Sequence, residues 1–268
     1  MELQMWREIL TPYELAVKEL TTKFEYLIKE HHDKGYYSSI ERVEGRVKSI
    51  VSILEKCQKK GISIDDVTEK VEDIAGVRII CQFVEDIERV AELLRQRSDL
   101  TIKQEKDYVN RPKDSGYRSY HMIAWYQVEL MDGPKKIMVE IQIRTMAMDY
   151  WATIEHSLQY KYKLHMPEEI QDRLLQVSDA TVLLDKEMSQ VRLEIMDAQN
   201  VFQHQAKVVA SILNTIQSLY RVAGAEQMEQ IQKDFYRIYS MNNLEQLDRF
   251  RRQLDHIAEG YHTQTIDE

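Results

Sequence analysis

Glycine, proline and cysteine are scarce in this sequence of 268 residues, which contains 8, 4 and 2 of them respectively. So few turn-forming residues argue against a sandwich or barrel of many short strands. Cys57 and Cys81 lie in apolar helical and strand-like runs, so a disulfide-stapled secreted domain is not expected. No apolar run reaches the roughly 18 to 20 residues of a membrane span, and no secretory signal follows Met1. We therefore expect a cytoplasmic protein that has no membrane partner.

The charge balance is acidic, with 36 Lys and Arg against 45 Asp and Glu, a net charge of −9 with neutral His. Such a balance argues against a protein that coats nucleic acid, but it leaves room for a local basic cleft. The composition, 43% hydrophobic and 30% charged, supports a buried core in one or two domains.

Hydrophobic periodicity predicts helices first and then strands alternating with helix. Helices are predicted over 5–31, 46–60, 65–74 and 86–96, and strands over 77–83, 100–109, 119–130 and 136–144. Residues 145–260 are predicted to be helical throughout, with breaks at Pro167 and near Gly224. The pattern indicates an α+β fold in which a mixed sheet is flanked by long N- and C-terminal helices.

One helix of the C-terminal half carries a long apolar seam, which predicts that it packs along another helix. That partner is either the chain's own first helix or a second subunit, and the two are compatible. The seam advances in steps of four and three through Leu174, Val177, Thr181, Leu184, Met188, Val191, Ile195, Ala198 and Phe202.

The predicted helix 46–60 has a basic face. At 100° per residue its apolar stripe comprises Val47, Ile50, Val51 and Leu54, and its polar face comprises Lys48, Ser52, Lys56 and Lys59. Three ammonium groups and a hydroxyl in this arrangement suit a run of phosphates. The same pattern also fits an ordinary solvated helix face.

Polar side chains also follow one side of the predicted strand 136–144. Ile137, Val139, Ile141 and Ile143 point one way, whereas Met138, Glu140, Gln142 and Arg144 point the other way. The polar side is either a reactive surface or a plain solvent-facing one.

Two further segments place charge close to strands. The loop 111–121 combines Lys113 and two arginines with Gly116 and with rings such as Tyr117 that can stack on a base. Asp73 lies at the mouth of the strand 77–83, and Arg78 lies within it. An acid and a base at strand ends commonly build a metal and phosphate site.

Taken together, these segments resemble one family. Residues 45–56, 73–78, 115–121 and 139–145, followed by Trp151-Ala-Thr-Ile-Glu-His156, resemble in this order the motifs of the RelA/SpoT alarmone synthetases. The resemblance covers residues 1–202 and is nearest to the stand-alone small synthetases called RelQ. It implies a nucleotidyltransferase-like synthetase domain over 1–203, with a catalytic core at about 40–165, and leaves 204–268 as a helical extension without an assigned role.

The resemblance implies a (p)ppGpp synthetase, which transfers the β,γ-pyrophosphate of ATP to the 3′-hydroxyl of GDP or GTP, and possibly of GMP. Asp73 and Glu140 are then the catalytic residues and hold Mg²⁺, and Glu140 also orients or deprotonates the hydroxyl. The implied ATP-binding residues are Arg46, Lys48, Ser52, Lys56, Lys59 and Arg78. The implied GDP- or GTP-binding residues are Lys113, Tyr117, His121, Gln142 and Arg144.

RelQ-like enzymes form homotetramers with a pppGpp site in a central cleft, and the resemblance implies a tetramer here. In that cleft the family usually has an aromatic residue, Thr and Asn where this chain has Arg42, Glu44 and Asp149. Two added acids repel a pentaphosphate, whereas Arg42 offsets part of that repulsion, so the sequence leaves product activation open. His31-His32-Asp33 resembles a hydrolase HD pair only superficially, and we expect these residues to close the first helix and no hydrolase domain to be present.

Other classes of function fit parts of the pattern. A regulatory module that binds nucleotides or single-stranded RNA, with weak or conditional synthetase activity, also uses a basic cleft with exposed rings. An RNA regulator of the synthetase is a related possibility. A polymerase-type nucleotidyltransferase shares the carboxylates but releases pyrophosphate rather than AMP, and a helical scaffold leaves the polar strand face unexplained.

Overall fold

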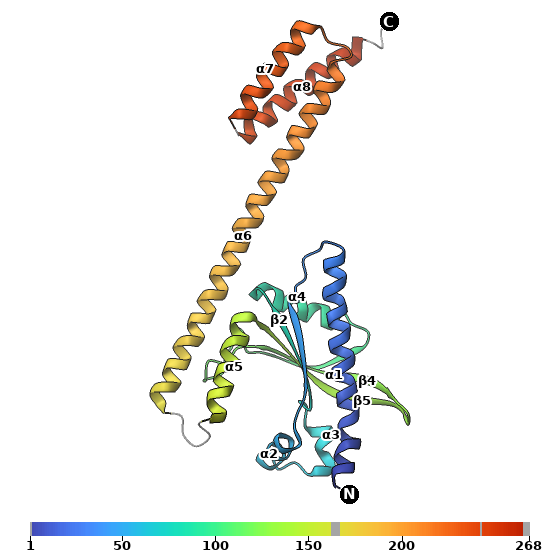
Figure 1. The fold of residues 1–268 in the computed structure, drawn as a ribbon, viewed down its shortest axis with the longest axis vertical. Helices are drawn as coiled ribbons and strands as arrows, with labels where there is room; N and C mark the ends of the chain where they lie inside the picture. Colours follow the sequence, from blue (N-terminus) through green and yellow to red (C-terminus); the bar gives the residue numbers. More distant parts are fainter. Residues whose placement is uncertain (1, 162–166, 242, 265–268) are drawn as a thin grey trace. The chain divides into compact units, whose positions relative to one another are not determined.

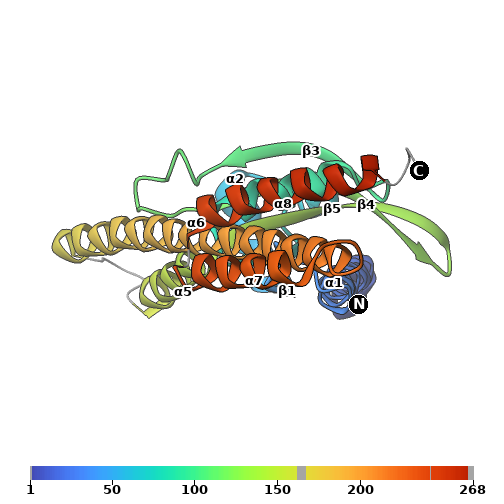
Figure 2. The ribbon, with the colours of Figure 1, turned by 90° about the horizontal axis from the view of Figure 1, so that it is seen from above.

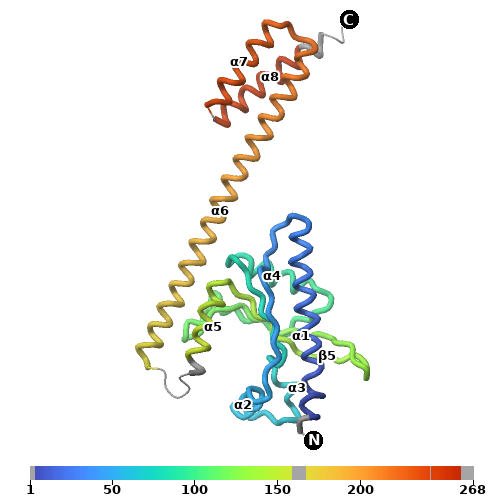
Figure 3. The backbone as a smooth tube through the Cα atoms, viewed as in Figure 1, coloured from blue at the N-terminus to red at the C-terminus, as the bar shows by residue number. Residues whose placement is uncertain are grey.

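The computed structural model describes residues 2–161, 167–241 and 243–264. The chain divides into two compact units, Met1–Gln190 and Val191–Glu268, whose elements are drawn in Figure 1 and traced in Figure 3. Among the described residues, no helix is long and apolar enough to cross a membrane.

The first unit contains a five-stranded sheet in the order β1-β2-β5-β4-β3. Strands β2 and β5 are parallel and the other neighbours are antiparallel, so the predicted mixed sheet of an α+β fold is confirmed. Figure 2 shows β4 and β5 running side by side to their shared turn. The strands are β1 (Arg42–Val47), β2 (Ala75–Cys81), β3 (Leu100–Asp107), β4 (Tyr120–Leu130) and β5 (Gly133–Thr145).

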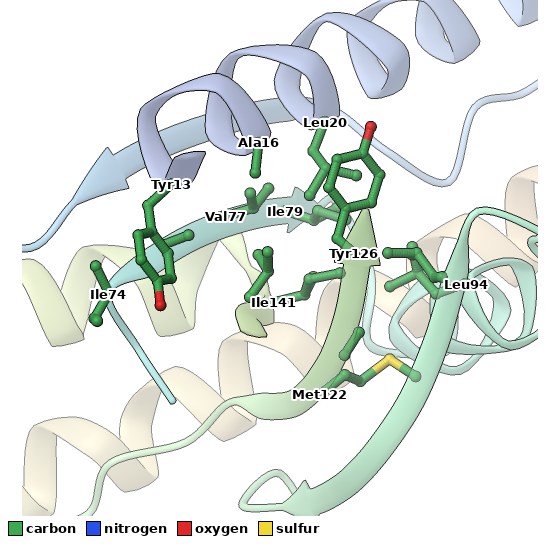
Figure 4. Packing of buried hydrophobic residues seen from close by; sticks show 14 of the residues in the cluster. Tyr13, Ala16, Leu20, Ile74, Val77, Ile79, Leu94, Met122, Tyr126 and Ile141 are labelled. Carbon is green, nitrogen blue, oxygen red and sulfur yellow. The ribbon is translucent and has the colours of Figure 1, made fainter. Parts of the chain in front are cut away.

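Helices α1 (Glu2–Asp33) and α4 (Val84–Arg95) bury their apolar stripes against one face of this sheet. As expected, residues 31–33 form the end of α1, where the His31 ring nitrogen Nδ1 lies 2.8 Å from the carbonyl oxygen of Leu27. The core includes Tyr13, Leu20, Ile79, Leu94, Met122 and Ile141, which are labelled in Figure 4 among the buried side chains of one cluster.

The prediction of a helix over 46–60 was wrong for residues 46–49, because strand β1 extends to Val47 and α2 (Ile50–Lys60) begins at Ile50. The strand pairs with β2 through Val47, and α2 begins only after Ser49, whose side chain accepts a hydrogen bond from the backbone N–H of Ser52. Gly45 permits α1 to lie directly against this strand, because a Cβ atom there would be 2.5 Å from a methyl group of Val17.

The later helix start also changes which side of α2 is buried. Ile53 and Cys57 face the core, whereas Val51 and Leu54 of the predicted stripe are 65% and 40% exposed. The predicted helix 65–74 is likewise shorter, because it consists of a 3₁₀ turn η1 (Ile64–Asp66) and α3 (Val67–Lys70). The chain is extended at Val71, and residues 72–74 turn into β2.

Beyond the sheet the chain is helical, as predicted, and forms α5 (Met146–Lys161) and α6 (Glu168–Leu219), the latter starting directly after Pro167. In the first unit, the side of α6 that is buried is polar and comprises Ser178, Thr181, Asp185 and Ser189. The Ser178 hydroxyl donates to the carbonyl of Gly116, and the Ser189 hydroxyl donates to Glu85 at 3.0 Å.

The seam positions Val177, Leu184 and Met188 are 48%, 54% and 47% exposed. Packing of the seam against the chain's own first helix was therefore a wrong expectation for the first unit. The heptad spacing identified an apolar side of α6 correctly, but of the seam residues in the first unit only Thr181 belongs to the buried set.

Asp185 makes the attachment of α6 sensitive to pH. Burial, together with the charge of Glu85, raises the pKa of Asp185 from 3.8 to about 6, although Thr145 Oγ1 donates a hydrogen bond to the carboxylate at 2.7 Å. Between about pH 4 and pH 6 the folded chain therefore binds more protons than the unfolded chain, so its free energy of unfolding falls as the pH rises through that range.

We expect Asp185→Asn to stabilise the protein at pH 7.5 by up to about 3 kcal/mol, because the amide still accepts from Thr145 and carries no charge. The gain shrinks to nothing below about pH 4, where the wild-type carboxyl is protonated in both states. Thermal unfolding of both proteins across this range measures the difference, and a gain that is the same at every pH would contradict the assignment to Asp185.

The second unit has its own hydrophobic core, formed by the end of α6 with α7 (Ala225–Ser240) and α8 (Leu244–Gln264). Gly224 precedes α7, so the break predicted there is confirmed. The buried side chains are Val208, Ile212, Ile216, Leu219, Met228, Ile231, Phe235, Leu247, Phe250 and Leu254.

Candidate active site

The face of the sheet opposite α1 and α4 gathers polar side chains from several strands. The register aligns Arg46, Gly76 and Glu140 in one row, and Glu44, Arg78 and Gln142 in the next. On β5 the isoleucines and Val139 are buried on the core side, so the predicted alternation of an apolar and a polar face is confirmed.

Asp73, in the turn just before β2, is the centre of a small charged cluster. Lys48 Nζ lies 2.8 Å from one carboxylate oxygen of Asp73 and Lys56 Nζ lies 2.7 Å from the other. Burial raises the pKa of Asp73, but the two ammonium groups outweigh burial, so the pKa is below its usual value. Lys48 lies in the connection before α2 rather than on the predicted helix, where its backbone N–H donates to the carbonyl of Ile74.

The other two members of the predicted basic face lie along α2. Ser52 is in its first turn, 2.9 Å from the Ser49 hydroxyl. Lys59 is exposed in the last turn, and within the described part of the chain it forms no ion pair with Asp73. The structure therefore brings Lys48 and Lys56 together with the acid but leaves Lys59 outside the cluster.

A pocket on this face is lined by Arg46 from β1 and Arg78 from β2, together with Glu44, Gly45, Gly76, Val77 and Gln142. Burial lowers the pKa of Arg78, and the nearby charge of Arg144 lowers it further. The Nε–H of Arg78 is buried without a hydrogen-bond partner. Because glycines lack side chains that would fill the pocket, the two planar guanidinium groups can hold a flat aromatic ring.

A closed ring of hydrogen-bonded side chains occupies the adjacent part of the face; we call it the Glu140 ring. Glu140 lies 3.2 Å from His121, and His121 lies 2.9 Å from the Tyr117 hydroxyl. The Arg144 guanidinium donates to that hydroxyl and, at 2.9 Å, to Gln142, whose amide donates to Glu140 at 2.7 Å.

The environment of the Glu140 ring keeps its carboxylate charged. Burial and the charge of Asp73 raise the pKa of Glu140, but hydrogen bonds from His121 and Gln142 lower it more, to below its ordinary value. Lys113 Nζ stands 4.9 Å from the centre of the Tyr117 ring. All five side chains predicted for the acceptor nucleotide are thus neighbours.

Asp149, in the first turn of α5, connects the two regions and is 4% exposed. Its carboxylate lies 2.9 Å from Arg42, 3.3 Å from Arg78 and 3.4 Å from Arg144. Sequence reasoning did not place Asp149 in the site. The available signal was an acid in the first turn of a helix that follows a polar strand face.

The residues present suit a magnesium ion. Asp73 Oδ1 is a buried oxygen without a hydrogen bond of good geometry, although the Lys56 ammonium is close. The charge of Asp73 acts on Glu140, so two carboxylates share the site. No group of three or more His, Cys, Asp or Glu in the described ranges forms a metal cage. Mg²⁺ typically takes one or two carboxylates and completes its shell with phosphates and water, which this pair permits.

Comparisons with known proteins establish the family. A family model described as a region found in RelA / SpoT proteins matches residues 45–165. The chain is 45% identical over 207 residues to the GTP pyrophosphokinase YjbM of Bacillus subtilis, covering 77% of this chain and 98% of that protein. The chain belongs to the RelA/SpoT family.

Solved structures of the family have the same fold. The small alarmone synthetase 1 from Bacillus subtilis bound to its product pppGpp has a TM-score of 0.69 and 46% identity, over 72% of this chain and 98% of that one. The same synthetase bound to AMPCPP has a TM-score of 0.65 and 42% identity, over 72% of this chain and 99% of that one. The RelA/SpoT fold thus includes the sheet that carries the charged cluster and the Glu140 ring.

Proposed function

We propose that this protein is a GTP pyrophosphokinase that transfers the β,γ-pyrophosphate of ATP to the 3′-hydroxyl of GDP or GTP, producing (p)ppGpp and AMP in a stringent response. The observation that carries the proposal is that the carboxylates of Asp73 and Glu140 are close enough to interact, beside a pocket lined by two arginines and a hydrogen-bonded ring that contains Tyr117. Its close relative is named for this activity.

We place ATP on the side of β1 and β2. The adenine ring stacks between Arg46 and Arg78, which line the pocket. The phosphates then reach Lys48 and Lys56, which exchange the carboxylate of Asp73 for phosphate oxygens, and Ser52 adds a hydroxyl at the start of α2. Lys59 joins only the far end of the phosphate chain.

We place GDP or GTP on the side of the Glu140 ring. Tyr117 offers a face for the guanine, and Lys113 and His121 supply cationic or donor groups for the ribose and the phosphates. Gln142 and Arg144 hold Tyr117 and Glu140 in position through the bonds of the ring.

In the reaction, the 3′-oxygen of the acceptor attacks the β-phosphorus of ATP. The new O–P bond forms while the bond from the β-phosphorus to the oxygen shared with the α-phosphorus breaks, and AMP leaves with that oxygen. Glu140, charged and half-buried, takes the hydroxyl proton. Asp73 and Glu140 hold Mg²⁺, which when bound neutralises the charge of the phosphates.

The decisive experiment is an incubation of the protein with Mg²⁺, γ-labelled ATP and GDP or GTP. We expect label in guanosine tetra- or pentaphosphate and an equal amount of AMP. Released pyrophosphate would instead indicate a polymerase-type nucleotidyltransferase. Binding of single-stranded RNA by folded protein that transfers no label would favour the binding module, which the comparisons do not support.

We further propose that the protein is a homotetramer that uses the apolar side of α6. Val177 and Leu184 line an open groove with Met146 and Tyr150, at the surface of the first unit. Exposed apolar side chains in such a continuous patch commonly mark a protein interface.

We expect Leu184→Glu to reduce the assembly to smaller species, because it places a charge in the patch that a second copy covers. Native mass spectrometry at micromolar concentration measures the change. Glu187→Lys, an exposed position on the next turn, is the control and leaves the assembly intact. A wild-type protein that is strictly monomeric under these conditions would contradict the proposal.

A further proposal concerns the residues that could bind a regulatory nucleotide. Arg42, which is a candidate for contacting a phosphorylated effector, is paired with Glu44 at 3.1 Å and with Asp149 at 2.9 Å. Glu44 and Asp149 therefore compete with a pentaphosphate for Arg42. The domain limits of 1–203 and 204–268 also remain a proposal, as does single-stranded RNA as a regulator.

A further inference from the structure

Asp149 is the one acidic side chain in the described residues that contacts both Arg78 and Arg144. Arg78 lines the pocket placed at the adenine, and Arg144 belongs to the Glu140 ring placed at the acceptor. These two arginines come from adjacent strands, and the carboxylate that they share comes from α5. One buried group is therefore in contact with a residue of each proposed nucleotide site.

The positive charges of Arg78 and Arg144 explain why both contact the Asp149 carboxylate. Arg144 is 4% exposed, and its charge acts unfavourably on Arg78, which is itself half-buried. Two guanidinium groups removed from water at close range are costly unless a carboxylate compensates them. Asp149, with only 6% of its side chain exposed, supplies that compensation from within 3.4 Å of each.

We infer that Asp149 is a positioning residue for both nucleotides: it holds Arg78 for the donor base and Arg144 for the ring that presents the acceptor. The inference deepens the proposed function and rests on its assignment of the two sites. Because both guanidinium groups bind one carboxylate, loss of its charge loosens both, and the affinities for donor and acceptor fall together.

Glu44 offers a matched control. Its carboxylate pairs with Arg42 at 3.1 Å and with Arg78 at 3.5 Å, but among the described residues it forms no ion pair with Arg144. Removing the charge of Glu44 therefore perturbs the donor side alone.

The test measures dissociation constants by calorimetry for a non-hydrolysable ATP analogue and, separately, for GDP. With Asp149→Asn we expect both constants to rise at least about tenfold, the scale expected when a buried charge pair is broken. With Glu44→Gln we expect only the constant for the ATP analogue to rise. Thermal unfolding of each variant establishes that the chain is folded.

A folded Asp149→Asn variant that binds GDP as the wild type does would overturn the inference, whatever happens to the ATP analogue. If that variant does not fold, Asp149→Glu retains the charge at a displaced position, and the two constants must again shift together. Binding is measured without turnover, so a wild-type protein that transfers no label would defeat the proposed function while leaving this test intact.

Discussion

Replacement of Glu140 by valine is expected to lower the rate of pyrophosphate transfer at least about 1000-fold, or roughly 4 kcal/mol in activation free energy. The variant loses the proton acceptor for the 3′-hydroxyl and one of two carboxylates at the metal site. Valine is accommodated in the strand because β-branched residues favour this backbone. The protein is therefore expected to fold, with the loss confined to turnover.

The measurement is label transfer from ATP together with AMP release, at saturating concentrations of both nucleotides. Glu129→Gln is the matched control, since Glu129 is an exposed carboxylate on the neighbouring strand β4 and contacts Gln127. The control should have wild-type activity. Near-normal turnover in folded Glu140→Val would remove Glu140 from the mechanism.

Asp73→Asn is expected to lower kcat at least about 100-fold, close to 3 kcal/mol, while the affinity for ATP stays the same or increases. The loss of kcat and the retained or increased affinity for ATP have one cause. In the described structure Asp73 occupies Lys48 and Lys56 with its own negative charge, so the neutral amide frees both lysines for phosphate while providing a poor ligand for Mg²⁺.

Steady-state kinetics at several Mg²⁺ concentrations, combined with binding of an ATP analogue, separates the two effects. Asp66→Asn is the control, because Asp66 pairs with the exposed Lys70 away from the cluster. A parallel loss of ATP binding and kcat would mean that Asp73 organises the phosphate site rather than the chemistry.

The parts of the site that sequence predicted are those carried by local periodicity. The two faces of β5 follow from strict alternation over a few residues, so Glu140, Gln142 and Arg144 could be placed on one surface in advance. Val208, Ile212 and Ile216 likewise recur at helical spacing in the sequence, and all three are buried in the core of the second unit.

What sequence did not predict depends on residues far apart in the chain. Strand β1 exists because it pairs with β2 and because Gly45 lets α1 approach, and neither fact is visible in a window of neighbouring residues. The contact of Asp149 with Arg78 spans 71 positions (149 − 78) and requires the parallel pairing of β2 and β5 to be known. Periodicity also cannot tell which side of α6 its own chain buries.

The Glu140 ring has a direction, which follows from its chemistry. A guanidinium only donates, so the Tyr117 hydroxyl oxygen accepts from Arg144, and a carboxylate only accepts, so a neutral His121 carries its hydrogen on Nδ1 toward Glu140. The Tyr117 hydroxyl must then donate to Nε2 of His121, at 2.9 Å. Both branches of the ring thus run from Arg144 to Glu140, and the Glu140 carboxylate determines the tautomer of a neutral His121.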